Sequence, residues 1–125
     1  MYKILLVGCG GFLGASARYI ISITSAKLLS SNFPYGTFIV NVIGCFLIGT
    51  IMESSYKLGN ISENMKVFLT TGILGGLTTF STFSNETVEL FLKGKAFTGI
   101  LNILLNVALC LAGVYMGKLL ISKTL

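Results

Sequence analysis

Four apolar stretches make up most of this chain, and each is long enough to cross a lipid bilayer as an α-helix. Such a helix needs about 20 predominantly apolar residues to span the hydrocarbon core. Only 10% of the 125 residues are charged, whereas a soluble domain carries roughly 25%. The sequence therefore predicts an all-α integral membrane protein in which residues 1–125 form a single domain. The four expected transmembrane helices are 4–23, 36–56, 67–92 and 97–121.

The charged and reactive residues exclude several classes of function. The net charge is +5, but no basic run exceeds Lys93 and Lys95, so we expect no nucleic-acid partner. The chain has no His and no Asp, and no nucleophile–base pair or metal cluster can be drawn, so we do not expect an enzyme. Cys9, Cys45 and Cys110 lie in apolar runs without paired spacing, which is typical of small packing residues.

Basic residues are divided almost evenly between the two expected sides of the membrane. One side holds Lys3, Lys57, Lys66, Lys118 and Lys123, and the other holds Lys27, Lys93, Lys95 and Arg18. Because an excess of Lys and Arg on the cytoplasmic side orients membrane proteins, this balance favours insertion in both orientations and an antiparallel homodimer. A single fixed orientation is the alternative. Glycines four residues apart would let helices approach closely, at Gly10/Gly14, Gly72/Gly76 and Gly113/Gly117.

The third stretch contains a predicted helix break near Gly75–Thr79, where a glycine pair precedes Thr78 and Thr79. A broken helix frees backbone carbonyls, which need partners at membrane depth. Carbonyls from two subunits would then form an oxygen cage for a hard cation such as Na⁺. The alternative is an intact helix whose glycines pack against a neighbouring helix.

Two phenylalanines follow this predicted break. At about 100° per residue, Phe80, Phe83, Ser84 and Thr87 share one helix face, and Glu86 lies beside Phe83. An aromatic ring has a positive edge, so two rings turned edge-on to a narrow path would stabilise a small anion without a full charge. The alternative is that both rings pack against lipid or neighbouring helices.

Amide side chains recur on the second and fourth stretches. Asn41 lies in the middle of the second, and the fourth carries a polar stripe of Thr98, Asn102, Asn106 and Cys110. Buried amides in lipid act as interhelical contacts by default, but donors along a path would also replace the hydration shell of an anion. Both interpretations stay open. Arg18, near the end of the first helix, would snorkel to the interface, attract anions to a pore mouth, or pair with Glu86.

Taken together, these residues resemble the Fluc (CrcB) family of bacterial fluoride channels. The resemblance covers nearly the whole chain and lies in three blocks, GGFLGASARY at 10–19, PYGTFIVNVIGCF at 34–46 and GGLTTFSTFS at 75–84. It departs from the family on the fourth helix. There, many members have a tyrosine followed by serines, whereas this chain has Asn102, Asn106 and Cys110.

The resemblance implies a dual-topology antiparallel homodimer in the bacterial plasma membrane, with two pores that export fluoride passively and lower its intracellular concentration. Phe80 and Phe83 would be the pore rings and Asn41 the pore amide. The carbonyls of Gly75 and Thr78 would hold a structural Na⁺ at the centre of the dimer. The remaining implied positions are a polar track of Ser81, Thr82, Asn102 and Asn106, and the pore-end charges Arg18 and Glu86.

Two other functions are compatible with four short transmembrane helices. A small multidrug-type exporter needs a carboxylate deep in the first helix, and residues 4–23 contain no acidic residue. A non-transporting membrane assembly subunit would bind lipid or partner helices and would tolerate loss of the polar stripe. The exporter function predicts resistance to quaternary ammonium dyes, and the assembly-subunit function predicts no ion flux.

Overall fold

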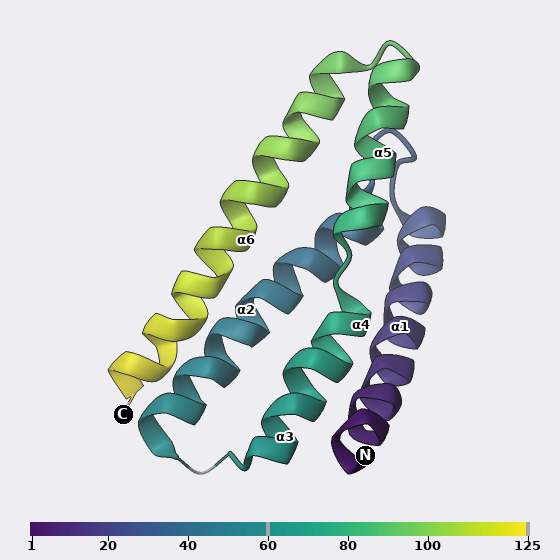
Figure 1. Cartoon of the computed structure of the whole chain (residues 1–125). Coiled ribbons are helices and arrows are strands. Elements are labelled where there is room, and N and C mark those ends of the chain that lie inside the picture. The colour runs from purple at the N-terminus through teal and green to yellow at the C-terminus, as the bar shows by residue number, and fades with distance from the viewer. Residues whose placement is uncertain (60, 125) are drawn as a thin grey trace.

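The computed structural model describes residues 1–59 and 61–124, and this part of the chain is helical throughout its regular structure (Figure 1). Its elements are α1 (Tyr2–Leu28), α2 (Tyr35–Leu58), α3 (Glu63–Val67), the π-helix η1 (Phe68–Leu74), α4 (Gly75–Leu77), α5 (Phe80–Leu92) and α6 (Ala96–Thr124). Elements α3 to α5 together form the third span, Glu63–Leu92. Four helices are therefore long and apolar enough to cross a membrane, which confirms the predicted all-α membrane fold.

The helices alternate in direction along the chain. Figure 1 shows both termini and the α2–α3 connection at one end, and the other two connections at the opposite end. This arrangement places the lysines on the two sides as predicted. The prediction that Arg18 lies near the end of the first helix is wrong, because α1 continues past Ile23 to Leu28. No glycine or proline interrupts residues 23–28, so nothing ends the helix earlier.

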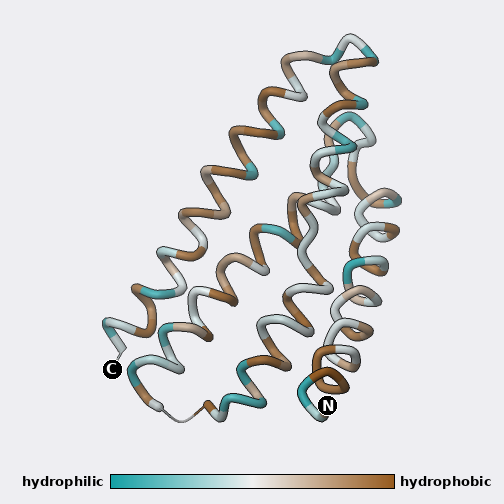
Figure 2. The backbone as a smooth tube through the Cα atoms, viewed as in Figure 1, coloured by the Kyte–Doolittle hydropathy of each residue, from teal (hydrophilic) through white to brown (hydrophobic). Residues whose placement is uncertain are grey.

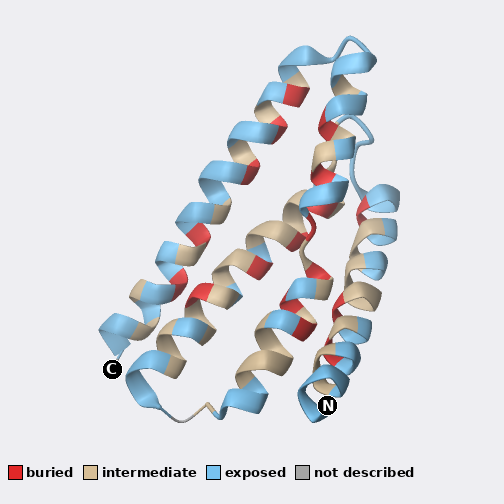
Figure 3. Cartoon of the chain, in the orientation of Figure 1, coloured by how far each residue is buried: buried red, intermediate tan, exposed pale blue. Residues whose placement is uncertain are grey.

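Most large apolar side chains face outward. Figures 2 and 3 show hydrophobic residues along the exposed faces of the helices and buried residues only where the helices meet. The buried hydrophobic residues of the described chain are Val40, Leu74, Leu77 and Phe83. An apolar exterior with so small a core is what lipid-facing helices require, because the acyl chains cover the outside.

Glycine backbones form the contact between α1 and the third span. A Cβ atom at Gly76 would lie 2.6 Å from the carbonyl oxygen of Gly11, and one at Gly10 would lie 2.7 Å from that of Phe68. A Cβ at Gly14 would overlap the carbonyl oxygen of Ile73. The glycines thus let two backbones touch, as the four-residue spacing predicts.

Helices α2 and α6 pack against each other in one constant register. Asn41 contacts Asn106, Glu53 contacts Lys118, and Lys57 contacts Ser122, and each pair is separated by 65 residues. A constant difference in residue number means that the two helices run parallel. Gly49, whose Cβ would overlap the carbonyl oxygen of Val114, brings the backbones together at the same offset.

The third span is broken at Thr78 and Thr79, as predicted. Both residues are extended, with ψ of 154° and 120°, between α4 and α5. Gly75 and Gly76 do not form the break, because both are helical. The threonine hydroxyls stabilise the broken ends. Thr78 Oγ1 donates to the carbonyl of Leu74 at 2.8 Å, and Thr79 Oγ1 accepts from the N–H of Thr82 at 3.2 Å as the N-cap of α5.

Candidate functional site

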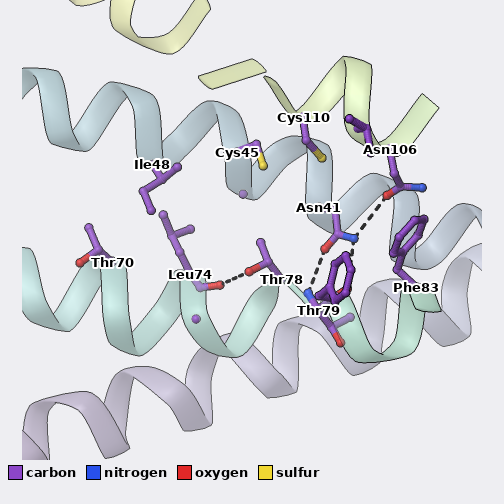
Figure 4. Close-up of a pocket in the computed structure, with 14 residues that line it drawn as sticks. Asn41, Cys45, Ile48, Thr70, Leu74, Thr78, Thr79, Phe83, Asn106 and Cys110 are labelled. Carbon is purple, nitrogen blue, oxygen red and sulfur yellow. Dashed lines mark hydrogen bonds between the residues drawn. The ribbon is translucent and has the colours of Figure 1, made fainter. Parts of the chain in front are cut away.

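A cavity of about 390 Å³ lies beside the break, between the third span and the paired helices α2 and α6 (Figure 4). Six of the residues that the resemblance assigns to the pore or the cation site line it: Asn41, Gly75, Thr78, Phe80, Phe83 and Asn106. They come from three separate spans, so the fold brings together residues that are far apart in the chain. The site is therefore centred on the helix break.

Asn41 binds both backbone polar groups of Thr79 in the broken segment. Its Oδ1 accepts from the N–H of Thr79 at 2.9 Å, and its Nδ2 donates to the carbonyl of Thr79 at 3.2 Å. The same Nδ2 donates to Oδ1 of Asn106 at 3.3 Å (Figure 4). Extended backbone at membrane depth needs such partners, so Asn41 is what allows the break to exist in lipid.

Replacing Asn41 with Ala is expected to destabilise the protein by about 1–3 kcal/mol, because the N–H and carbonyl of Thr79 lose their partners in a low-dielectric environment. Thermal unfolding in detergent measures the change. Asn64→Ala is the control, since Asn64 is exposed on α3. Equal melting temperatures for both variants would contradict the proposed clamp.

The break also deprives the carbonyl oxygens of Gly75 and Thr78 of their usual helical partners. In a continuous helix the carbonyl of Gly75 would accept from the N–H of Thr79, but that N–H binds Asn41. The carbonyl of Thr78 would accept from the N–H of Thr82, which binds the Thr79 hydroxyl instead. Gly75 and Thr78 both line the cavity, so their hard oxygen donors suit an alkali cation.

Phe80 and Phe83 form an aromatic pair at this site. Their ring centroids are 5.5 Å apart and the planes are tilted by 49°. The rings differ in exposure, since Phe83 is 8% exposed and Phe80 is 78% exposed. The expected common face is therefore only partly correct, because Phe83 packs inside the chain while Phe80 projects from it. The hydroxyls of Ser84 and Thr87 donate to the carbonyls of Phe80 and Phe83 within α5.

The predicted polar stripe on the fourth helix divides into two parts. Asn106 Nδ2 donates to Asn102 Oδ1, and Asn102 Nδ2 donates to Thr87 Oγ1, both at 2.9 Å. Asn102 is 1% exposed and joins α6 to α5. Interhelical contact therefore accounts for the hydrogen bond that Asn102 donates, whereas the one that it accepts from Asn106 lies within α6. Asn106 and Cys110, further along the helix, line the cavity.

The remaining predicted residues lie away from the cavity. Ser81 and Thr82 are exposed at the start of α5, with their hydroxyls 3.2 Å and 3.1 Å from Thr79 Oγ1. Glu86 Oε1 accepts from the hydroxyl of Thr37 at 2.9 Å, and smaller cavities of about 220 and 260 Å³ adjoin this residue. Arg18 is half-buried, and Thr37 rather than Arg18 occupies the position against Glu86.

Four residues of the site make contacts that the sequence did not predict. Thr37 binds Glu86, Thr79 caps α5, Thr87 binds Asn102, and Cys45 lines the cavity. A signal for two of them is present, because Thr37, Asn41 and Cys45 recur every four residues. This spacing matches that of Asn102, Asn106 and Cys110 on the helix that packs against them.

Comparison with known proteins assigns the family. A family model described as "CrcB-like protein, Camphor Resistance (CrcB)" matches residues 5–118. A fluoride-specific ion channel FluC of Clostridium perfringens is 58% identical over 114 residues, which cover 91% of this chain and 89% of that one. The protein of the same name from Ruminiclostridium cellulolyticum is 51% identical over 125 residues, or 100% of this chain and 95% of that one. One from a Shewanella species is 48% identical over 121 residues, 97% of each chain. With its four apolar helices and this match over nearly its full length, the chain belongs to the CrcB family.

Proposed function

We propose that this chain is a fluoride-selective ion channel of the bacterial plasma membrane that exports fluoride passively and lowers its concentration in the cytoplasm. The relatives described as fluoride-specific channels support it, as does one structural observation. A helix break at membrane depth, held by Asn41, adjoins an aromatic pair and a cavity between three spans. A channel makes and breaks no covalent bond, so the lack of a nucleophile–base pair in the sequence agrees with this function.

The functional unit that we propose is an antiparallel homodimer with two pores. Phe80 is 78% exposed at the edge of the cavity, so a second copy would cover a ring that otherwise faces lipid. The near-even division of basic residues between the two ends supports insertion in both orientations. Antiparallel copies would place each exposed Phe80 against the partner and enclose the open side of the cavity.

Selection of fluoride would depend on partial charges along a narrow path. The ring edges of Phe80 and Phe83 and the hydroxyls of Ser81 and Thr82 offer positive dipole ends without a full charge. The amide of Asn41, whose two N–H donors bind Thr79 and Asn106, would exchange one of these bonds for the anion. Such groups replace the hydration shell of a small anion, and a path too narrow for chloride excludes it. Asn106 would orient the Asn41 side chain through their hydrogen bond, and Asn102 would in turn orient Asn106. Glu86 and Arg18 would lie toward the pore ends.

The experiment that tests this function is fluoride efflux from liposomes that contain the purified protein, with valinomycin setting the membrane potential. Rapid fluoride efflux without chloride efflux is the expected result. Absence of fluoride efflux from folded, dimeric protein would refute the channel function. A quaternary ammonium dye in the same liposomes distinguishes an exporter, which would move the dye.

A structural Na⁺ at the centre of the dimer is part of the proposal. The residues fit it, because the break releases the carbonyls of Gly75 and Thr78, and two copies would double the oxygen donors. The ion would fix the broken segments of two chains against each other, without moving through the pore. We expect a higher thermal unfolding temperature in Na⁺ buffer than in N-methylglucamine buffer of equal ionic strength. Equal temperatures would count against the ion.

A further inference from the structure

Cys45 and Cys110 form a pair of thiols on the wall of the cavity. Both are free, and both line the same space beside the helix break. Cys45 comes from α2 and Cys110 from α6, two helices that pack against each other. Figure 4 shows both sulfur atoms on the side of their helices that faces the cavity. The pair is thus accessible from the same volume as Asn41 and the phenylalanine rings.

The register of α2 against α6 places the two cysteines opposite each other. The hydrogen-bonded pair of Asn41 and Asn106 is separated by 65 residues, as are Cys45 and Cys110 one turn further along. The next turn at this offset is the backbone contact of Gly49 with Val114, which holds the helices together. The thiols therefore lie between two fixed contacts, and neither helix can turn its cysteine away without breaking one of them.

We propose that Cys45 and Cys110 form a binding site for a soft monovalent cation of the Cu⁺ class. Thiolate sulfur is the side-chain ligand that such ions prefer, and two facing thiols supply a two-coordinate site. Binding replaces two S–H bonds by two sulfur–metal bonds and releases two protons to water, so the affinity rises with pH. No oxidant or reductant is required. The hard carbonyl oxygens of Gly75 and Thr78 do not compete for this ion.

The bound ion would block the channel, and this consequence rests on the proposed function. Cys45 and Cys110 are each four residues from an amide of the Asn41–Asn106 pair, on the same helix faces. An ion held there occupies the cavity next to Phe80 and Phe83. It would reduce the width of the path, and the two thiolates with their one monovalent cation carry a net charge of −1, which repels the passing anion.

Metal binding is measured first, without reference to transport. Purified protein in chloride-free detergent buffer competes for Cu⁺ with the chromophoric chelator bathocuproine disulfonate under anaerobic conditions. We expect Cys45→Ser and Cys110→Ser each to lower the affinity at least tenfold, because a hydroxyl replaces one of two soft ligands. The control Cys9→Ser, at an exposed thiol on α1, should bind as the unaltered protein does. Unchanged affinity in both site variants would overturn the proposal, as would an equal loss in Cys9→Ser.

Block is then measured as fluoride efflux from liposomes with Ag⁺ nitrate as a redox-stable probe of the same class. Addition of Ag⁺ should slow efflux through the unaltered protein and through Cys9→Ser. It should leave the efflux through Cys45→Ser at the rate that this variant shows without Ag⁺. Size-exclusion profiles show that each variant is folded. Inhibition that persists in Cys45→Ser and Cys110→Ser would refute block at this site. Cu⁺ binding by protein that moves no fluoride even without metal would refute the channel function and leave the metal site intact.

Discussion

Replacing Phe80 with Ile is expected to reduce fluoride efflux to the level of protein-free liposomes while the protein still folds. Phe80 is 78% exposed on the single chain, so its ring contributes little to the packing of the helices. Isoleucine keeps an apolar side chain of moderate size but removes the positive ring edge that would stabilise the anion. The loss should therefore appear in transport and not in stability. Phe83→Ile should have the same effect on transport, with an added cost because Phe83 is buried.

The control for Phe80→Ile is Phe97→Ile. Phe97 is 80% exposed on α6 and does not line the cavity, so the two substitutions match in chemistry and exposure. Efflux is measured in liposomes with valinomycin, and size exclusion reports whether the proposed dimer remains. Near-normal efflux in both Phe80→Ile and Phe83→Ile would refute the role of the rings.

Replacing Gly14 with Ala is expected to prevent α1 from packing against the third span. The added Cβ would overlap the carbonyl oxygen of Ile73 and lie 2.9 Å from the N–H nitrogen of Leu77. Overpacking against flexible side chains costs about 1–3 kcal/mol, and contact with backbone should reach the upper end of that range because the helix itself must move. We expect a lower yield of folded protein and a lower unfolding temperature in detergent.

Gly8→Ala is the matched control for Gly14→Ala. Both glycines lie on α1, but a Cβ at Gly8 meets no atom within 4 Å. Alanine there should stabilise the helix by about 0.5–1 kcal/mol, because glycine has the greater backbone freedom to lose. An unfolding temperature of Gly14→Ala equal to that of Gly8→Ala would show that the glycine contact is not what limits the approach of the helices.

The approximate position of the helix break could be predicted from the sequence, but its cause could not. Two glycines and two threonines in an apolar segment indicate a weak point, and the break is there. The structure shows that the glycines stay helical against α1 and that the threonines form the break. The decisive partner is Asn41, 38 residues away along the chain. Local pattern does not reveal which distant side chain satisfies a freed backbone group.

The depth of Arg18 and the role of Asn102 could not be predicted from the sequence for a similar reason. The length of α1 decides how deep Arg18 lies, and hydropathy defines helix ends poorly where polar residues continue the helix. Asn102 sits in a stripe that looks uniform in the sequence. It is buried against Thr87, while Asn106 faces the cavity. The difference lies in the neighbouring helix, because Asn102 bonds to α5 and Asn106 bonds to α2.

The sequence by itself determined that this chain has four membrane-spanning helices, that the third is interrupted, and that the family is CrcB. These properties depend on composition and on motifs read along the chain, which are local. Only the tertiary structure decided which residues meet, because backbone contacts at Gly49 and Gly14 set the register of the helices. That register places Asn41 against Asn106 and Cys45 against Cys110, and the spacing along one helix alone cannot determine its offset from another.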